Sequence, residues 1–325
     1  MTLQPLTVTV ACGRYDRVQD LFEGRIDTDG LVLRPVHPSG GAPEIFFRST
    51  RYAEFDVTEM SFSSYLTSLD SAERPFVAIP VFLSRAFRHG NIFVSERSGI
   101  QRPEDLRGKR VGVSEFGTSA SVWIRGMLDD EYGLRAEDMA WFSRREEKLE
   151  ADRGGVVINS LPGGSLDAAL VVGDIDAVIG SMRIRGQGVR RLFEDHRTVE
   201  TEYYRRTRIF PIMHVLAIRR DLYDDQPWIA RTLYKAFAEA RLRCLDRMAK
   251  TSVSPYMLPW VTAYLEEQRE ALGEDIWSYG VEANAAALEA FARYAHEQGL
   301  TRRCISVDEM FVPYRHTNND PRFGR

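Results

Sequence analysis

The sequence has little cysteine, and its few cysteines are not grouped. Cys12, Cys244 and Cys304 are odd in number and lie far apart. A disulfide scaffold or a zinc site needs closely spaced sets of these residues. The cysteine content therefore favours a protein of a reducing compartment, and we expect the cytoplasm.

Other features are absent as well. The longest apolar runs, such as residues 76–83, fall far short of the ~20 residues that a bilayer span needs. The N-terminal sequence MTLQPLTVTVACGRYD lacks the basic start and sustained apolar core of a secretory signal. A net charge of −4 gives no general attraction to nucleic acid or to membranes. We therefore expect no nucleic-acid partner, no membrane partner and no secretion.

Alternating strands and helices are what the sequence does contain, and this is typical of an α/β fold with mostly parallel sheets. In the first part of the chain we expect a helix at residues 62–69 and strands at residues 6–11, 31–36, 55–57 and 76–83. Ligands of such sheets bind at the carboxyl ends of the strands. This rule places Arg14, Tyr15, Glu59, Ser61 and Arg85 near one edge.

The stretch PEDLRGKRVGVSEFGTSAS, residues 103–121, predicts an anion-binding turn. Residues 110–113 form a short buried strand, and a turn of small and hydroxylated residues leads into a helix that begins at Ala120. Free N–H groups and the positive end of the helix dipole suit a carboxylate or phosphate, with Thr118 and Ser119 beside them. The alternative is that Thr118 or Ser119 only caps the helix.

The length of 325 residues exceeds what one core usually supports, so we expect two lobes with a ligand cleft between them. Residues 1–88 and 215–325 are expected to form lobe 1, and residues 89–214 lobe 2. Two inter-lobe segments would lie near residues 84–94 and 209–218. The C-terminal extension of lobe 1 is expected to contain helices at residues 226–248, 256–272 and 281–298, followed by a loose tail after Pro313.

Several segments carry a family resemblance. DLRGKRVGVSEFGTS (105–119) and VVGDIDAVIG (171–180) resemble the type II periplasmic-binding-protein fold. Within that superfamily the chain resembles the 4,5-dihydroxyphthalate decarboxylase family in four segments that, with the first two, span most of its length. These are EMSFSSYL (59–66), SRAFRHGNIFV (84–94), FPIMHVLAIRRDLY (210–223) and YGVEANAAALEAFARYAHEQGL (279–300).

The resemblance implies an enzyme that converts 4,5-dihydroxyphthalate to protocatechuate and carbon dioxide, without an organic cofactor and as a homo-oligomer. The substrate needs cations for two carboxylates, a base for a phenol and an acid near the ring carbon. We assign the proton work to His89 and His214, one on each inter-lobe segment, with Glu59 as a base or as the group that orients a histidine. The alternatives are core or hinge histidines and a carboxylate that only favours a helix start.

Carboxylate clamps are sought among the arginines near strand ends. Arg14, Arg85 and Arg183 are the candidates, with Arg88 adjacent, because the planar guanidinium binds carboxylates bidentately. The alternative for each of these arginines is a solvated surface residue that binds no substrate. Tyr15 would bond a ring hydroxyl or simply pack, and Ser61, Thr118 and Ser119 would complete the substrate site.

Three alternatives remain open from the sequence. Glu59, His89 and His214 have the composition of a two-histidine, one-carboxylate metal site, although no short HxxxH spacing supports it. The same fold also serves solute-binding proteins that hold a small carboxylate without catalysis. Cytoplasmic enzymes of this fold with other substrates include chorismate dehydratase and a pyrimidine synthase of thiamine biosynthesis.

Overall fold

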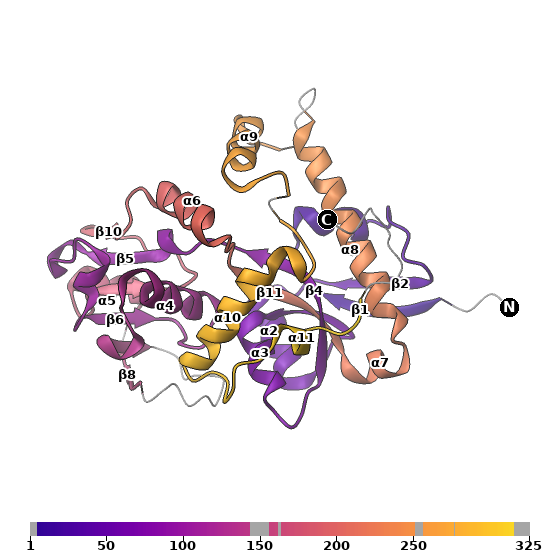
Figure 1. Cartoon of the computed structure of the whole chain (residues 1–325), viewed down its shortest axis with the longest axis horizontal. Helices are drawn as coiled ribbons and strands as arrows, with labels where there is room; N and C mark the ends of the chain where they lie inside the picture. The colour runs from indigo at the N-terminus through magenta and orange to yellow at the C-terminus, as the bar shows by residue number, and fades with distance from the viewer. Residues whose placement is uncertain (1–4, 144–155, 162–163, 251–255, 276, 315–325) are drawn as a thin grey trace.

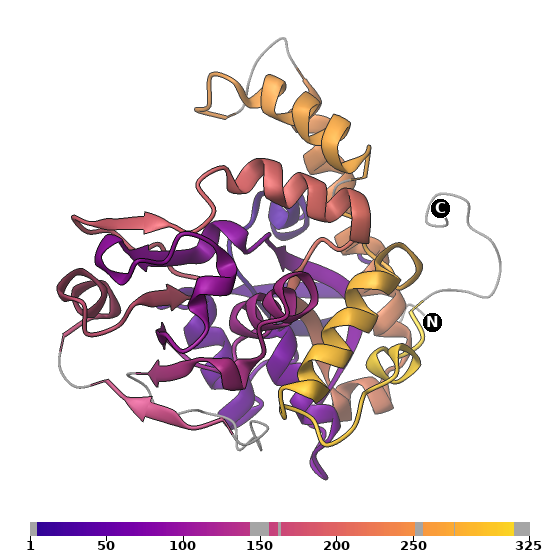
Figure 2. The same cartoon turned by 60° about the vertical axis from the view of Figure 1, so that its left-hand side comes forward.

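The structure, a computed structural model, describes residues 5–143, 156–161, 164–250, 256–275 and 277–314. It contains two β-sheets with helices packed around them (Figure 1). Figure 2 shows the same arrangement with the second sheet brought forward. The predicted α/β architecture with two lobes is therefore confirmed, and we refer to the two sheets with their helices as lobe 1 and lobe 2.

The sheet of lobe 1 has the strand order β2-β1-β3-β11-β4. Its strands are β1 (Leu6–Ala11), β2 (Leu31–Val36), β3 (Val57–Ser61), β4 (Phe76–Arg85) and β11 (Ile212–Arg219). β1 pairs in parallel with β2 and β3, whereas β11 runs antiparallel to both β3 and β4. β11, on which the chain returns from lobe 2, thus lies within the first sheet, between β3 and β4.

The sheet of lobe 2 has the order β10-β5-β9-β6-β7-β8. Its strands are β5 (Ile92–Ser95), β6 (Arg110–Val113), β7 (Ala140–Ser143), β8 (Ile158–Ser160), β9 (Ala177–Ile179) and β10 (Val189–Arg191). The pairs among β9, β6, β7 and β8 are parallel, and β5 is antiparallel to β9 and β10. Both sheets therefore contain more antiparallel strand pairs than the alternation of strands and helices predicted. The chain reaches β5 and β11 from the other lobe, so these two strands are not joined to a neighbour by the crossover that a parallel pair requires.

Eleven α-helices are assigned among the described residues. They are α1 (Gln19–Phe22), α2 (Gly41–Tyr52), α3 (Phe62–Leu69), α4 (Ser119–Tyr132), α5 (Leu166–Val172), α6 (His196–Thr207), α7 (Arg220–Asp225), α8 (Trp228–Ala249), α9 (Val261–Leu272), α10 (Ala285–Glu297) and α11 (Val307–Met310). In the part of the chain that the structure describes, no helix is long and apolar enough to cross a bilayer.

The lobes share a core. α10 packs against α3 of lobe 1 and α4 of lobe 2, and it lies across the junction in Figure 1. At this junction the ring centroid of Phe291 lies 4.9 Å from that of Phe62 and 5.1 Å from that of Trp123. All three side chains are almost fully buried, so apolar burial holds the two lobes together through the C-terminal helix.

Most local predictions are confirmed. The strands over 6–11, 31–36 and 110–113 and the helix over 62–69 have the predicted bounds. One strand is misplaced, since β3 covers Val57–Ser61 and not residues 55–57. Glu59 lies inside that strand, where a buried carboxylate hides the apolar pattern that usually marks a strand.

The lobe boundaries are bracketed by the strands. The chain leaves the first sheet after Arg85 and enters the second at Ile92, and it returns between Arg191 and Ile212. The boundary expected at residues 214 and 215 falls inside β11, which belongs to the first sheet over its whole length. The tail expected after Pro313 lies almost wholly outside the described residues.

Candidate active site

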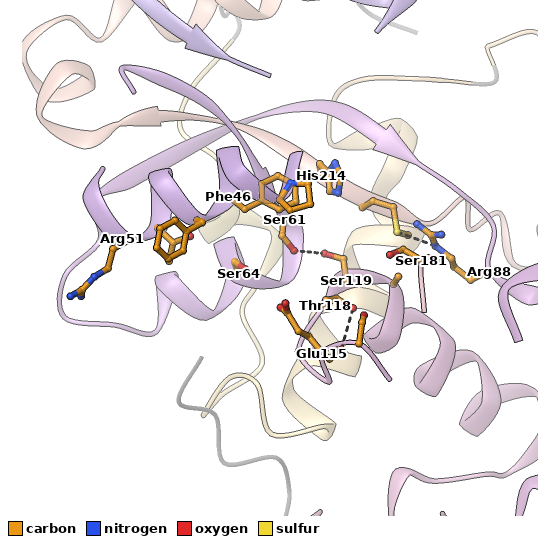
Figure 3. A pocket seen from close by; sticks show the side chains of 17 residues that line it. Phe46, Arg51, Ser61, Ser64, Arg88, Glu115, Thr118, Ser119, Ser181 and His214 are labelled. Atoms are coloured by element: carbon orange, nitrogen blue, oxygen red, sulfur yellow. Dashed lines mark hydrogen bonds between the residues drawn. The ribbon is translucent and has the colours of Figure 1, made fainter. Parts of the chain in front are cut away.

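A pocket of about 520 Å³ lies between the lobes (Figure 3). Lobe 1 contributes α2 and the junction of β3 with α3, lobe 2 contributes the turn between β6 and α4, and β11 contributes its first residues. Of the site residues expected from the sequence, Ser61, Thr118, Ser119 and His214 line this pocket. Segments from both lobes thus meet around one cavity.

His214 is held by a buried carboxylate. Its Nδ1 atom lies 2.6 Å from Oε1 of Glu59, and His214 is 20% exposed whereas Glu59 is fully buried. Glu59 also accepts hydrogen bonds from the hydroxyl of Tyr15 at 2.6 Å and from the N–H of Gly13 at 2.8 Å. The histidine therefore reaches the pocket, and the carboxylate stands behind it.

The charge state of Glu59 follows from these contacts. Burial by itself would raise the pKa of this carboxyl, but the hydrogen bond and charge of His214, with the hydrogen bonds from Tyr15 and Gly13, lower the pKa below its usual value. An ionised Glu59 can only accept, so Nδ1 of His214 carries a proton. Nε2 is then the ring nitrogen left for exchange with a ligand.

Gly13 allows Tyr15 to take part in this cluster. A Cβ atom at residue 13 would lie 2.6 Å from Cζ of Tyr15, which is too close for any side chain. Arg17 lies over the phenol ring, with its guanidinium carbon 4.0 Å from the ring centroid. Arg17 itself donates from Nε to the carbonyl of Leu83 at 2.9 Å, so the cation that contacts the phenol is held in place.

A register shift aims His214 at the pocket. On β11, Ile212 pairs with Arg85 and His214 with Ser84, so two residues of β11 advance against one of β4. Successive side chains on a regular strand point to opposite faces, but a bulge breaks this alternation. Met213 and His214 consequently both line the pocket.

Two helix starts meet beside His214. Thr118 caps α4 by accepting the N–H of Ser121 at 3.3 Å. Oγ of Ser119 accepts the N–H of Ser63, in the first turn of α3, at 3.0 Å and lies 2.9 Å from Oγ of Ser61. Both serines belong to a bridge between the lobes, and the positive ends of two helix dipoles face the same cavity. The capping role considered for Thr118 is therefore present, and Thr118 and Ser119 also line the cavity.

Two arginines line the pocket that were not among the chosen clamps. Arg51 lies on α2, is exposed, and occupies one end of the cavity, while Arg88 lies at the other end (Figure 3). Arg88 had been noted only as a neighbour of Arg85. Arg51 gave no sequence signal, because an arginine near the end of an amphipathic helix looks like any solvated residue.

The predicted arginine clamps lie elsewhere. Arg85 is buried and donates to the carbonyls of Ser278 at 3.1 Å and Phe210 at 2.7 Å, so it ties the inter-lobe segments to the C-terminal part. Arg14 and Arg183 are exposed and are not among the residues that line the pocket. The strand-end rule fixes an edge of the sheet but not the direction of a long side chain.

His89 does not meet His214 in the pocket. It is 2% exposed, and its ring lies between those of Phe193 and Tyr203, with centroids 5.4 and 5.1 Å away. Burial lowers the pKa of His89 to about 4, with the nearby charges of Arg206 and His196 adding to the effect. In the described part of the chain, no group of three or more His, Cys, Asp or Glu side chains is spaced to hold a metal ion, so Glu59, His89 and His214 are not assembled as a ligand set.

Comparison with solved structures identifies the fold. The chain matches the periplasmic aliphatic sulphonate-binding protein SsuA of Escherichia coli with a TM-score of 0.55 and 16% identity, over 95% of this chain and 98% of that one. It matches the alkanesulfonate-binding protein SsuA of Xanthomonas axonopodis pv. citri with a TM-score of 0.53 and 13% identity, over 96% and 99%. The fold is that of the periplasmic binding proteins.

Sequence comparison then gives the family. No protein-family model matches the chain. The chain is 38% identical over 324 residues to 4,5-dihydroxyphthalate decarboxylase of Comamonas testosteroni, covering 96% of this chain and 98% of that protein. It is 36% identical over 219 residues to the enzyme of the same name from Pseudomonas putida, covering 62% and 83%. The chain belongs to the 4,5-dihydroxyphthalate decarboxylase family.

Proposed function

We propose that this chain catalyses the reaction after which its relatives are named, the decarboxylation of 4,5-dihydroxyphthalate to protocatechuate and carbon dioxide. The observation that carries the proposal is the imidazole of His214, which faces a pocket between the lobes while its Nδ1 atom is bonded to the buried Glu59. This is the arrangement of a histidine that exchanges protons with a ligand.

The chemistry of the substrate sets what the site must do. Each carboxylate is para to a hydroxyl, and loss of the hydroxyl proton raises the electron density on the ring carbon that bears the carboxylate. Protonation of that carbon gives a keto form, and the bond to the carboxylate then breaks as carbon dioxide leaves and the electron pair restores the aromatic ring. The net reaction consumes one proton.

The residues of the pocket match these demands. Glu59 fixes the tautomer of His214, so we assign proton transfer to Nε2 of His214 and the orienting role to Glu59 and Tyr15. The start of α4, with Thr118 and Ser119, presents partial positive charge to the carboxylates. Ser61 adds a hydroxyl from lobe 1 at the same place.

We further propose that the reaction needs neither an organic cofactor nor a metal ion. The para hydroxyl lets the ring itself hold the electron pair during bond cleavage, while His214 supplies proton transfer and the start of α4 supplies partial positive charge. A divalent ion remains the alternative. Turnover that disappears with a chelator and returns with a divalent ion would establish it.

The experiment is an assay of purified protein with 4,5-dihydroxyphthalate, with and without chelator, in which product is separated by chromatography. Protocatechuate should form in both, and in heavy water it should carry deuterium where the carboxylate was lost. His214→Asn should lower turnover at least ~100-fold while circular dichroism stays unchanged. Saturable binding of the substrate without product would instead favour the solute-binding alternative.

We also propose a cytoplasmic homo-oligomer. Support for assembly comes from exposed apolar side chains in α9 and in the turn before it, and α9 projects from the body in Figure 1. These side chains are Met257, Leu258, Trp260 and Tyr264. Free cysteines at residues 12, 244 and 304 suit a reducing compartment. Light scattering should give a multiple of the chain mass that falls in Trp260→Ser, and cell fractionation tests the location.

A further inference from the structure

Arg88 differs from the other arginines described above because it reaches the pocket from within the protein. It follows β4 on the inter-lobe segment, is partly buried and lines the cavity (Figure 3). Arg51, at the opposite end, lies on the exposed side of α2. The pocket therefore has an inner cation and an outer one.

The partners of Arg88 are neutral. Nε lies 3.3 Å from Sδ of Met213, and Nη1 lies 3.4 Å from Oδ1 of Asn91. Among the described residues no carboxylate forms an ion pair with this guanidinium. Burial lowers the pKa of Arg88 to about 10, which still leaves it charged at neutral pH. The charge of Glu200 acts on Arg88 without an ion pair, so the sheltered cation has no directly bonded counter-charge and gains most from a ligand that brings an anion.

Neighbouring contacts fix the position of Arg88. Asn91 donates from Nδ2 to the carbonyl of Met182 at 3.3 Å, and the bulge on β11 places Met213 under the guanidinium. The N–H of Gly90 donates to Oε1 of Glu200 on α6 at 3.1 Å, which holds the backbone on the other side. The cation is thus prepositioned, and little order has to be gained on binding.

The two carboxylates of the substrate make opposite demands on such a cation. The departing carboxylate loses its negative charge to the ring, so a strong ion pair to it stabilises the ground state and opposes cleavage. The retained carboxylate stays anionic from substrate to product, so a cation there contributes equal binding throughout and does not hinder the chemical step. An arginine fork can hold it bidentately.

We propose that Arg88 binds the carboxylate that the substrate keeps, and that the pocket therefore selects rings with an anionic group ortho to the departing carboxylate. This inference rests on the proposed function. The departing carboxylate then lies toward His214 and the aromatic wall of Phe46, whose ring centroid is 4.7 Å from that of His214.

Two analogues test the proposal, because each has only one carboxylate to lose. In 4,5-dihydroxy-2-sulfobenzoate a sulfonate replaces the retained carboxylate, and in 2-carbamoyl-4,5-dihydroxybenzoate a neutral amide replaces it. The wild-type kcat/KM for the sulfonate should be within about tenfold of that for the diacid, whereas for the amide it should be at least ~30-fold lower. Equal turnover of amide and diacid by the wild type overturns the proposal.

Variants locate the selecting residue. In Arg88→Gln the ratio of kcat/KM for diacid over amide should fall to within about threefold, with KM for the diacid rising more than kcat falls, because binding common to ground and transition states is lost. Arg51→Gln is the matched control and should keep the ratio near the wild-type value. A preserved ratio in Arg88→Gln, or its collapse only in Arg51→Gln, contradicts the assignment.

Two further measurements keep the outcome clear. If Arg88→Gln does not fold, Arg88→Lys keeps the charge without the fork, and its ratio should fall by at least about threefold; an unchanged ratio counts against Arg88. If the wild type shows no turnover, the proposed function fails on its own. Calorimetric binding of phthalate against its neutral diamide then still tests Arg88, since only the dianion should lose affinity in Arg88→Gln.

Discussion

Nδ1 of His214 lies 2.6 Å from Oε1 of Glu59, although 155 residues separate them in the sequence. The contact joins two neighbouring antiparallel strands, β3 and β11, and one of these strands brings the chain back from lobe 2. Because the carboxylate is fully buried and the imidazole is 20% exposed, one partner orients and the other meets the ligand. Glu59 and His214 are therefore best understood as one unit.

Replacement of Glu59 by glutamine should show whether the charge of this side chain, and not only its volume, orients His214. The amide keeps the volume of the side chain but removes the negative charge that holds the proton on Nδ1 of His214, so we expect turnover to fall by ~100-fold or more. Tyr15→Phe is the matched control, since it removes one neutral donor and leaves the charge, and its loss should be about tenfold or less. Turnover of Glu59→Gln close to wild type would contradict the orienting role.

The serine bridge between the lobes should contribute measurably to stability. Ser119→Ala leaves the buried N–H of Ser63 without its acceptor, so the free energy of unfolding should fall by about 1–3 kcal/mol in urea titrations. Ser61→Ala breaks only bonds between hydroxyls, to Ser119 at 2.9 Å and to Ser63 at 3.0 Å, and should cost about 1 kcal/mol or less because no backbone N–H loses its acceptor. A larger loss in Ser61→Ala than in Ser119→Ala would show that the hydrogen bond from the N–H of Ser63 to Ser119 is not the main contribution of the bridge to stability.

Burial of His89 predicts a pH dependence of stability rather than of catalysis. Its pKa is lowered to about 4 in the folded state, so between pH 4 and the unfolded value near 6.5 the unfolded chain binds more protons. Stability is therefore complete above about pH 6.5 and is lost as the pH falls, by about 2 kcal/mol between pH 7 and pH 5.

His89→Gln removes the group that titrates, so its unfolding free energy should fall less than that of the wild type over the same pH range. Denaturant titrations of both proteins at pH 7 and pH 5 give the comparison, and each protein serves as its own reference. Identical pH dependence in the two proteins would show that His89 does not titrate on unfolding. A loss of turnover as large as that of His214→Asn would place His89 in the chemistry.

Arg85 should behave as a structural residue. Lysine at this position keeps the charge but cannot donate to the carbonyls of both Ser278 and Phe210, so Arg85→Lys should lower the free energy of unfolding by about 1–2 kcal/mol. KM for the substrate should change less than about threefold, since Arg85 does not line the pocket. Unchanged stability with a large rise in KM would return Arg85 to the role of a carboxylate clamp.

The sequence by itself determined the local elements and the site residues next to them. Apolar residues alternate with threonine in residues 6–11, and residues 110–113 form a short, mostly apolar strand. Thr118 caps the helix that follows it. These signals depend on hydrogen bonds and side-chain periods within one or two turns of chain, so they can be recognised without the rest of the molecule. The family resemblance likewise depends on short segments.

Only the tertiary structure decided which polar side chains meet. His89 and His214 look equivalent in the sequence, yet one is packed among aromatic rings and the other faces the pocket. Arg85 and Arg88 are three residues apart, and only Arg88 lines the cavity. The direction of each side chain follows from strand register, the bulge at Met213 and the packing of α6 and α10, which are set by contacts between distant segments. No local pattern encodes those contacts, because the same short apolar strand can pair in several registers until the core selects one.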